Sequence, residues 1–219
     1  MADPESRRAT LERTQLHRIL AAETWVFAEE FALIGDDQRL QDVLRAHLAR
    51  LGEEVELHSD PVGTRPDGTG VIPDLVLSGA VARADNHVHN LVVELKRPSV
   101  NVGVEEFRQL EDYALAVTSD VRFNQPNVSW EFWIVGNQVK PEVLALTGGT
   151  LERPVQTVAG GTAKVRACTW AEVISNAEHR LKFVRGSLEY RVTEESAHAY
   201  LNERHADYLP DVLKDAEPE

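Results

Sequence analysis

Three charged residues within two short apolar segments have the residue types and spacing of a site that binds a divalent cation. Asp74 lies in GVIPDLVL at residues 70–77, and Glu94 and Lys96 lie in LVVELKRPS at residues 91–99. Because side chains alternate along a strand, Glu94 and Lys96 would share one face while their apolar neighbours occupy the other. Burying either charge alone costs free energy, so the two charges must be paired, hydrated or part of a site.

Two carboxylates on neighbouring strands are the feature that suggests a reaction. If the two segments pair as antiparallel strands, Asp74 approaches Glu94, and the carboxylates repel each other unless a cation lies between them. A hard cation held by two carboxylates, with water in its other positions, polarises a phosphate oxygen and generates hydroxide near neutral pH. Lys96, about one step further along the strand, would contact the scissile phosphate or orient the attacking water. The chemistry that this arrangement predicts is hydrolysis of a phosphodiester.

Hydrophobic periodicity predicts the elements that must position these residues. Apolar residues at spacings of three and four predict helices, and a change to a period of two predicts strands. Before residue 100 we expect a helix at about 11–31 with a break at Glu23 and Thr24, a helix from Leu40 to Leu51, a strand beginning at Val55, and strands at 71–77 and 91–96. After residue 100 we expect a helix at 104–117, an interior strand at 130–135, a loop at 147–162, an edge strand at 164–168, a helix opened by Thr169 and Glu172, and a last helix from Thr193 to before Pro210.

These elements predict one α/β (α+β) domain over residues 1–219, with helices packed on a central mixed sheet. The core would span about residues 10–136, and a strand with additional C-terminal helices would follow at about 163–208. Both ends, residues 1–9 and 210–219, are polar, and we expect them to be disordered.

The order Pro73-Asp74, twenty residues to Glu94, and then Leu95 and Lys96 resembles the motif of the PD-(D/E)xK nuclease superfamily. The restriction-endonuclease-like fold of that superfamily has a core of a helix, three antiparallel strands, a crossover helix and a further strand, which the predicted elements reproduce. The resemblance implies that Asp74, Glu94 and the Leu95 carbonyl ligate Mg²⁺ or Mn²⁺, and that Lys96 assists the nucleophilic water.

Many members of this superfamily add a glutamine on the crossover helix and a glutamate on the first helix. Gln109, one turn before Tyr113 on the predicted crossover helix, matches the glutamine and is implied to be a catalytic residue. Glu29 or Glu30 in VFAEEF matches the glutamate, and the motif does not choose between them. The implied metal ligands therefore include Glu30, with Glu29 as the alternative.

A narrower resemblance covers most of the chain after residue 15. ETWVFAEEF, IPDLVL, LVVELKRPS and QLEDYALAV are similar to segments of nuclease domains in Shedu-type anti-phage systems and of nuclease-like C-terminal domains of bacterial histidine-kinase-like ATPases. The resemblance implies DNA as the substrate and a role in bacterial anti-phage defence. It also implies a partner ATPase as a separate chain or a domain absent from this sequence, because these 219 residues hold no phosphate-loop motif.

Charge and composition limit the class of partner. The net charge of −13 argues against tight binding of nucleic acid through lysine and arginine alone. The acidity lies in the flanks, however, because residues 61–186 hold 14 acids and 13 bases. A divalent cation would supply positive charge at the reacting phosphate. No apolar stretch approaches a membrane span, the N-terminus lacks a secretory pattern, and the one cysteine, Cys168, fits a reducing compartment, so we expect a cytoplasmic protein without membrane contact.

Each signal also has a structural interpretation. An E-x-K triplet is common, so a structural ion pair or a degenerate site is the alternative to a nuclease site. His87 and His89 would face a metal only with a third ligand, and none stands out nearby, which favours a polar hairpin loop. Trp130 and Trp133 are expected in the core rather than stacked on bases. Arg97 alternates away from the site and would contact a phosphate backbone or solvent.

Two functions from different classes follow from this sequence. The first is a metal-dependent deoxyribonuclease, with RNA as a further option for its target. The second is a binding or assembly module that has the same fold and little catalysis, and that scaffolds a partner ATPase or a homo-oligomer. The net charge favours the module, as do four aromatic residues of the predicted C-terminal helices, Trp170, Tyr190, Tyr200 and Tyr208. Binding of a divalent cation separates the two functions.

Overall fold

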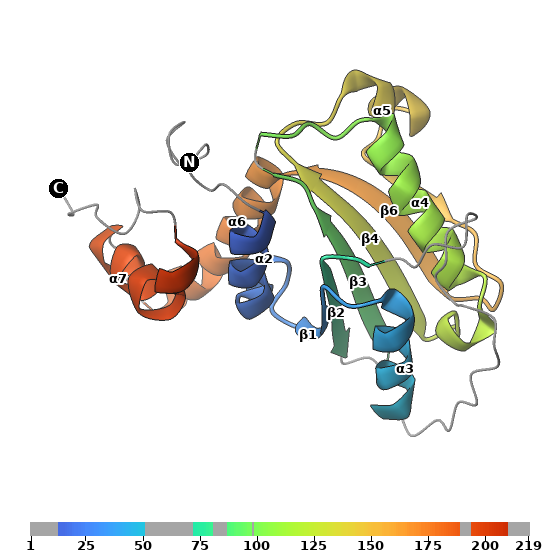
Figure 1. The fold of residues 1–219 in the computed structure, drawn as a ribbon, viewed down its shortest axis with the longest axis horizontal. Helices are drawn as coiled ribbons and strands as arrows, with labels where there is room; N and C mark the ends of the chain where they lie inside the picture. The colour runs from blue at the N-terminus through green and yellow to red at the C-terminus, as the bar shows by residue number, and fades with distance from the viewer. Residues whose placement is uncertain (1–12, 51–71, 81–86, 98, 189–193, 210–219) are drawn as a thin grey trace.

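The computed structural model describes residues 13–50, 72–80, 87–97, 99–188 and 194–209. These residues contain a six-stranded sheet with strands in the order β1-β2-β3-β4-β6-β5 (Figure 1). The strands are β1 (Ala32–Asp36), β2 (Leu75–Ala80), β3 (Val88–Leu95), β4 (Val128–Gly136), β5 (Glu152–Val155) and β6 (Thr162–Thr169). The helices are α2 (Arg13–Ala22), α3 (Leu40–Arg50), α4 (Val104–Thr118), α5 (Pro141–Leu146), α6 (Trp170–Leu188) and α7 (Glu194–His205), with 3-10 turns η1 (Thr24–Val26), η2 (Val121–Phe123) and η3 (Ala206–Tyr208).

Strand direction changes within the sheet at β3. The strands β1, β2 and β3 pair antiparallel, whereas β3, β4 and β6 run parallel, and β5 is antiparallel to β6. Parallel neighbours need a crossover connection, and α4 lies in the one from β3 to β4. The carboxyl ends of β3, β4 and β6 therefore meet at one end of the sheet, and β2 begins at that same end.

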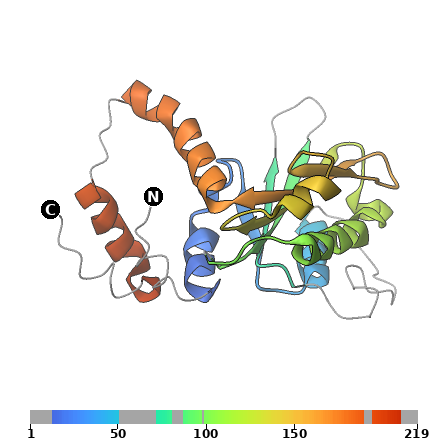
Figure 2. The ribbon, with the colours of Figure 1, turned by 90° about the horizontal axis from the view of Figure 1, so that it is seen from above.

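Helices cover both faces of the sheet because its central strands are apolar on both sides. On the face that carries the side chains of Val76 and Val92, α3 and α4 complete the core; we call this the α4 face. On the opposite face, which carries Leu75 and Val93, α2, α6 and the segment around η1 complete a second core; we call this the α2 face. In both views α7 lies beyond α2, on the side away from β5 (Figures 1 and 2).

The predicted fold class is confirmed, because a mixed sheet flanked by helices is consistent with a restriction-endonuclease-like core. The predicted crossover helix appears as α4, the three central strands appear as β2, β3 and β4, and both predicted C-terminal helices are present. The predicted strand at Val55 and both predicted disordered ends lie outside the described residues.

The predicted break at Glu23 and Thr24 is confirmed, and an unpredicted strand follows it. The helix α2 ends at Ala22, the rest of the segment expected as helix up to Phe31 holds only the short turn η1, and β1 then pairs with β2. Gly35 of this five-residue strand lies so close to Val43 of α3 that a Cβ atom there would be 2.4 Å from a Val43 methyl group. A short strand with a glycine at the contact lacks the alternating apolar pattern from which strands are predicted.

The prediction of an edge strand at 164–168 was wrong in position. This segment is β6 and lies between β4 and β5, while β5, within the segment predicted as a loop, forms the edge of the sheet. Pro154 of β5 has no N–H to donate, and proline is tolerated on edge strands for that reason. The proline and the two charged residues before it interrupt the apolar alternation, so periodicity did not predict this strand. None of the helices in the described part of the chain is long and apolar enough to cross a bilayer.

Candidate active site

The register of β2 and β3 places two carboxylates side by side on the α4 face. Leu75, the first residue of β2, pairs with Val93 of β3, so Asp74 falls next to Glu94. Val76, two positions after Asp74, and Val92, two positions before Glu94, belong to the core of the α4 face. Because side chains alternate, both carboxylates project to that face, as the motif spacing predicts.

Asp74 is held through its side chain and through its main chain. Its carboxylate Oδ2 accepts a hydrogen bond from the Leu95 N–H at 2.6 Å. Its carbonyl oxygen accepts the Asp37 N–H at 3.1 Å and lies 2.7 Å from His17 Nε2. The residue is fully buried. These contacts keep the carboxylate beside the peptide that joins Glu94 to Leu95.

Lys96 lies at the solvent side of the pair. Its ammonium nitrogen is 3.2 Å from Glu94 Oε1, and its side chain is 21% exposed against 8% for that of Glu94. The main chain of Lys96 is also held, because its N–H donates to the Val135 carbonyl at 2.8 Å and its carbonyl accepts the Trp170 indole N–H at 3.2 Å. The three charged side chains thus run from the buried Asp74 to a lysine that solvent reaches.

The donor set of this cluster fits a hard divalent cation. Two carboxylates and the Leu95 main-chain carbonyl are oxygen ligands of the kind that Mg²⁺ and Mn²⁺ prefer. Among the described residues, no group of three or more histidine, cysteine, aspartate or glutamate side chains is arranged to hold a metal. The chain would therefore supply two carboxylates, and Mg²⁺ is commonly bound by one or two carboxylates with water and substrate oxygens completing its shell.

Gln109 lies on α4, partly buried at the margin of the α4 face. Its side-chain amide donates to the Tyr113 hydroxyl at 2.8 Å, and Tyr113 is buried in the core of that face. The structure therefore places Gln109 on the same side of the sheet as Glu94, but its hydrogen bond is to Tyr113 and not to the carboxylate pair.

Glu29 and Glu30 are not brought to the pair. Glu30 lies against Gly79, five residues along β2 from Asp74. At about 3.4 Å per residue this separation is roughly 17 Å, too far for one ion to bridge. Glu29 is 3.3 Å from the Arg180 guanidinium of α6. Glu30 lies far from Asp74 because strand β1 separates them. This strand runs antiparallel to β2, so Asp36 at its end, and not Glu30, lies opposite the start of β2.

His87, just before β3, and His89, within β3, contact separate partners on β4. His87 Nε2 is 2.9 Å from the Ser129 hydroxyl, and His89 Nε2 is 3.3 Å from Glu131 Oε1. Glu131 also accepts the Trp133 indole N–H at 2.8 Å and lies 3.2 Å from Lys164 Nζ. These contacts form a polar network on the α2 face and do not build a metal site from His87 and His89.

The Glu131 carboxylate is strongly stabilised in its charged form by this network. Burial acts to raise its pKa, but hydrogen bonds from His89 and Trp133, together with the charge of Lys164, lower the pKa to about 2. Trp133 contributes the indole donor, and the Cζ atom of Arg166 lies 5.1 Å from the centre of its ring. Trp130, in contrast, is buried and donates to the Phe123 carbonyl at 2.6 Å, as expected for a core residue.

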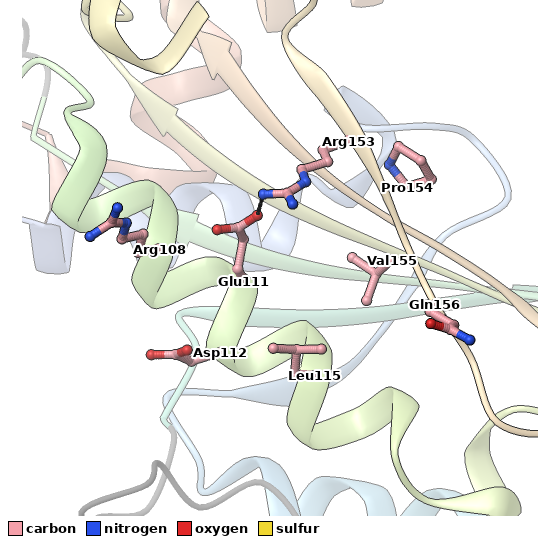
Figure 3. A pocket seen from close by; sticks show the side chains of 8 residues that line it. All are labelled: Arg108, Glu111, Asp112, Leu115, Arg153, Pro154, Val155 and Gln156. Carbon is pink, nitrogen blue, oxygen red and sulfur yellow. Dashed lines mark hydrogen bonds and ion pairs between the residues drawn. The ribbon is translucent and has the colours of Figure 1, made fainter. Parts of the chain in front are cut away.

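A surface groove of about 450 Å³ lies between α4 and β5 (Figure 3), and neither Asp74 nor Glu94 lines it. Arg153 of β5 reaches across it to Glu111 of α4 at 2.7 Å. The groove also holds one further arginine and one further acid, so its charges balance. None of the residues predicted for the site lines it; those that do are Arg108, Glu111, Asp112, Leu115, Arg153, Pro154, Val155 and Gln156.

Three residues next to the candidate site were missed from the sequence. His17 and Asp37 contact the Asp74 carbonyl, and Trp170 contacts the Lys96 carbonyl. His17 is 57 residues from Asp74, and Trp170 is 74 residues from Lys96, so no local spacing connects them. A capping box at Thr169 and Glu172 did predict the start of α6, which is the one signal that placed Trp170 near a strand end.

Comparison with known proteins gives one structural match of low similarity. No protein-family model and no curated protein matches the chain. Among solved structures, the crystal structure of a repair endonuclease from Pyrococcus abyssi matches with a TM-score of 0.35 and 14% sequence identity. The match covers 63% of this chain and 44% of that endonuclease, so the chain spans less than half the length of the protein it resembles. We therefore base the function on the geometry of the site.

Proposed function

We propose that this protein is a metal-dependent nuclease that hydrolyses phosphodiester bonds of DNA. The observation that carries the proposal is the convergence of Asp74, Glu94 and Lys96 on the α4 face, where the β2–β3 register sets the two acids side by side. The Lys96 ammonium lies 3.2 Å from Glu94 on the side open to solvent. Two carboxylates side by side repel each other, and this repulsion favours a cation between them.

Each side chain has a role that its position supports. Asp74 and Glu94 would hold Mg²⁺ or Mn²⁺, and the bound ion would supply positive charge that polarises a phosphate oxygen. Lys96 would exchange its contact with Glu94 for an oxygen of the phosphate and stabilise the charge that develops there. A water oxygen would bond to phosphorus, and the bond from phosphorus to the leaving sugar oxygen would break. The attacking water would lose its proton to solvent, and the leaving sugar oxygen would take a proton from solvent.

The biological setting of the proposal rests on the motif resemblance to Shedu-type nucleases and to nuclease-like domains of bacterial histidine-kinase-like ATPases. That resemblance supports a role in anti-phage defence in the bacterial cytoplasm, together with an ATPase chain or domain. It also keeps Gln109 as a candidate to contact substrate, since its amide lies on the same side of the sheet as the pair.

The test is cleavage of plasmid DNA by the purified protein with Mg²⁺, with Mn²⁺ and with EDTA. We expect cleavage only with a metal, and Lys96→Met should lower the rate by at least about 100-fold because charge stabilisation at the phosphate is lost. Lys164→Met is the matched control, since Lys164 also lies 3.2 Å from a strand carboxylate, Glu131, on the opposite face. Cleavage by Lys96→Met at the rate of Lys164→Met would refute the assignment.

A binding or assembly module is the second candidate, and the position of the C-terminal helices favours it. The helix α7 lies beyond α2 rather than on the sheet, and Tyr200 and Tyr208 are exposed there (Figure 2). Calorimetry with Mn²⁺ and measurement of the molecular mass in solution separate the two functions. An assembled protein that binds no Mn²⁺ at millimolar concentration would support the module and contradict the nuclease.

A further inference from the structure

His17 contacts the main chain of the candidate site from the opposite face of the sheet. The side chain lies on α2 and is 5% exposed, and its Nε2 is 2.7 Å from the Asp74 carbonyl oxygen. Asp36 Oδ1 lies 2.6 Å from the same nitrogen. Because both neighbours of Nε2 are acceptors, the proton of the imidazole belongs on Nε2, and His17 is a donor at this point.

A bulge in β1 brings Asp36 to this face. The register of β1 against β2 shifts between Leu33 and Gly35, after which Asp36 pairs with Leu75, whose side chain lies on the α2 face. The Arg18 guanidinium lies 3.1 Å from the other oxygen of Asp36. The acid is therefore fixed between α2 and the end of β1, and it supports the orientation of the imidazole.

The Asp74 main chain depends on these contacts because Asp74 precedes β2. The paired residues of β2 begin at Leu75, so the strand ladder does not include Asp74. Its carbonyl is instead held by the Asp37 N–H and by His17. Asp37 itself has a φ of 51°, a left-handed conformation that aspartate tolerates better than most residues.

We infer that His17 is a positioning residue that holds the Asp74 main chain so that the Asp74 carboxylate stays beside Glu94. The inference rests on the proposed function, since it treats Asp74 as a metal ligand. Partners behind a ligand set its orientation, and their loss commonly lowers metal affinity or activity by about 10- to 100-fold. His17 acts from the α2 face, while the ligand oxygens lie on the α4 face, so it never meets the ion or the substrate.

Two amide variants of different length separate positioning from simple stability. His17→Gln places an amide N–H near the position of Nε2, whereas His17→Asn is one carbon shorter and does not reach the Asp74 carbonyl. We expect His17→Asn to weaken Mn²⁺ binding, measured by calorimetry with MnCl₂, by about tenfold, and His17→Gln to restore most of it. Cleavage by His17→Asn should recover as Mn²⁺ is raised.

His205→Asn is the matched control. His205 is also a buried histidine, 3% exposed, and its Nε2 is 3.0 Å from a carboxylate, Glu23. It contacts the C-terminal side of α2 and not Asp74. We expect His205→Asn to lower the thermal midpoint of unfolding to a degree similar to His17→Asn while leaving the Mn²⁺ affinity within about twofold of the unchanged protein. Equal losses of Mn²⁺ affinity in both variants would overturn the inference.

A measurement on metal-free protein keeps the inference separate from the proposed function. The Leu95 N–H is protected by its bond to the Asp74 carboxylate, so its hydrogen exchange, followed by NMR, reports where that carboxylate lies. We expect faster exchange of this amide in His17→Asn and not in His205→Asn. Unchanged exchange and unchanged Mn²⁺ affinity would overturn the role of His17.

The unsubstituted protein supplies the final arms of the test. If it neither binds Mn²⁺ nor cleaves DNA, the proposed function fails, whereas Leu95 exchange still decides whether His17 holds Asp74. If His17→Asn does not fold, the Nε2 proton of His17 in the unsubstituted protein becomes the probe. It should be slow to exchange with water, and its resonance should move when Mg²⁺ is added; a resonance that does not move would overturn the inference.

Discussion

Two acidic clusters lie on opposite faces of the same sheet and differ in how their charge is balanced. On the α2 face, Glu131 is surrounded by His89, Trp133 and Lys164, and its pKa falls to about 2. On the α4 face, Asp74 and Glu94 lie side by side, and the Lys96 ammonium is 3.2 Å from Glu94. The first cluster has one acid among several donors, whereas the second brings two acids together.

This difference teaches that burial of an acid on a strand does not by itself indicate a site. Donors on adjacent strands satisfy Glu131, so that network stabilises the sheet. Asp74 and Glu94 are two acids side by side, which repel each other unless a cation lies between them, and solvent reaches Lys96 beside them. Equivalent acid-to-amide substitutions in the two clusters therefore test the comparison directly.

The largest effect is expected from Asp74→Asn, which should abolish Mn²⁺ binding and lower DNA cleavage by at least about 100-fold, because a charged ligand is lost. Glu131→Gln, the corresponding change on the α2 face, should leave Mn²⁺ affinity and DNA cleavage within about twofold of the unsubstituted protein. Calorimetry with MnCl₂ and plasmid cleavage measure the two outcomes. Loss of Mn²⁺ binding in Glu131→Gln instead would reverse the roles of the clusters.

Next in size is the acid dependence of stability that Glu131 causes. Its folded-state pKa of about 2 lies below the usual 4.5, so its contribution is fully present above about pH 4.5 and is lost as the pH falls toward 2. A shift of this size corresponds to up to about 3 kcal/mol. Urea unfolding at pH 7, 4 and 3 should show a gap between the unsubstituted protein and Glu131→Gln that narrows as the pH falls. A gap independent of pH would contradict this origin.

A smaller and local effect is expected at Glu23, which anchors the C-terminal helices. Its carboxylate accepts bonds from Trp25, Tyr200 and His205 at 2.7 to 3.0 Å. Burial acts to raise the pKa of Glu23, but these bonds outweigh it and lower the pKa. Glu23→Gln should therefore speed limited proteolysis within α7 severalfold while Mn²⁺ binding stays unchanged. Faster cleavage within β2 or β3 would mean that Glu23 supports the whole fold instead.

The smallest effect is expected at Trp170, whose indole N–H donates to the Lys96 carbonyl from α6. Trp170→Phe removes one neutral hydrogen bond and should lower the maximal cleavage rate by about threefold to tenfold. The affinity for Mn²⁺ should not change, because Lys96 is not a ligand. An equal loss of Mn²⁺ affinity would show that Trp170 acts on the carboxylates and not on the lysine.

The central strands and the crossover helix were predictable because their pattern is local. Alternation in β3 placed Glu94 and Lys96 on one face, and the three-and-four spacing of Phe107, Leu110, Ala114 and Val117 predicted the buried side of α4. The proximity of Asp74 to Glu94 also followed from the sequence, because antiparallel pairing of two apolar segments leaves few registers. The proximity of Asp74, Glu94 and Lys96 was therefore predictable from the two segments that carry them.

Strand β1 was not predictable from pattern, and without it the position of Glu30 relative to Asp74 could not be predicted. Five residues with a glycine and a bulge carry no alternation, so the predicted helix ran to Phe31 and residues 32–35 received no element. With β1 in the sheet, Glu30 lies beside Gly79, and Asp36 occupies the position next to the start of β2. A short strand is stabilised by its neighbours and not by its own residues, and this is why only the folded chain reveals it.

Residue order alone predicted that two acids and a lysine meet on two adjacent apolar strands, and the proposed chemistry rests on that grouping. The supports behind them came from folding: His17 and Trp170 reach the carbonyls of Asp74 and Lys96 across 57 and 74 residues. Contacts over such separations depend on how α2 and α6 pack on the sheet, and packing is a property of the whole core. The side chains proposed to react follow a local pattern, whereas those that hold them in place are determined by the tertiary structure.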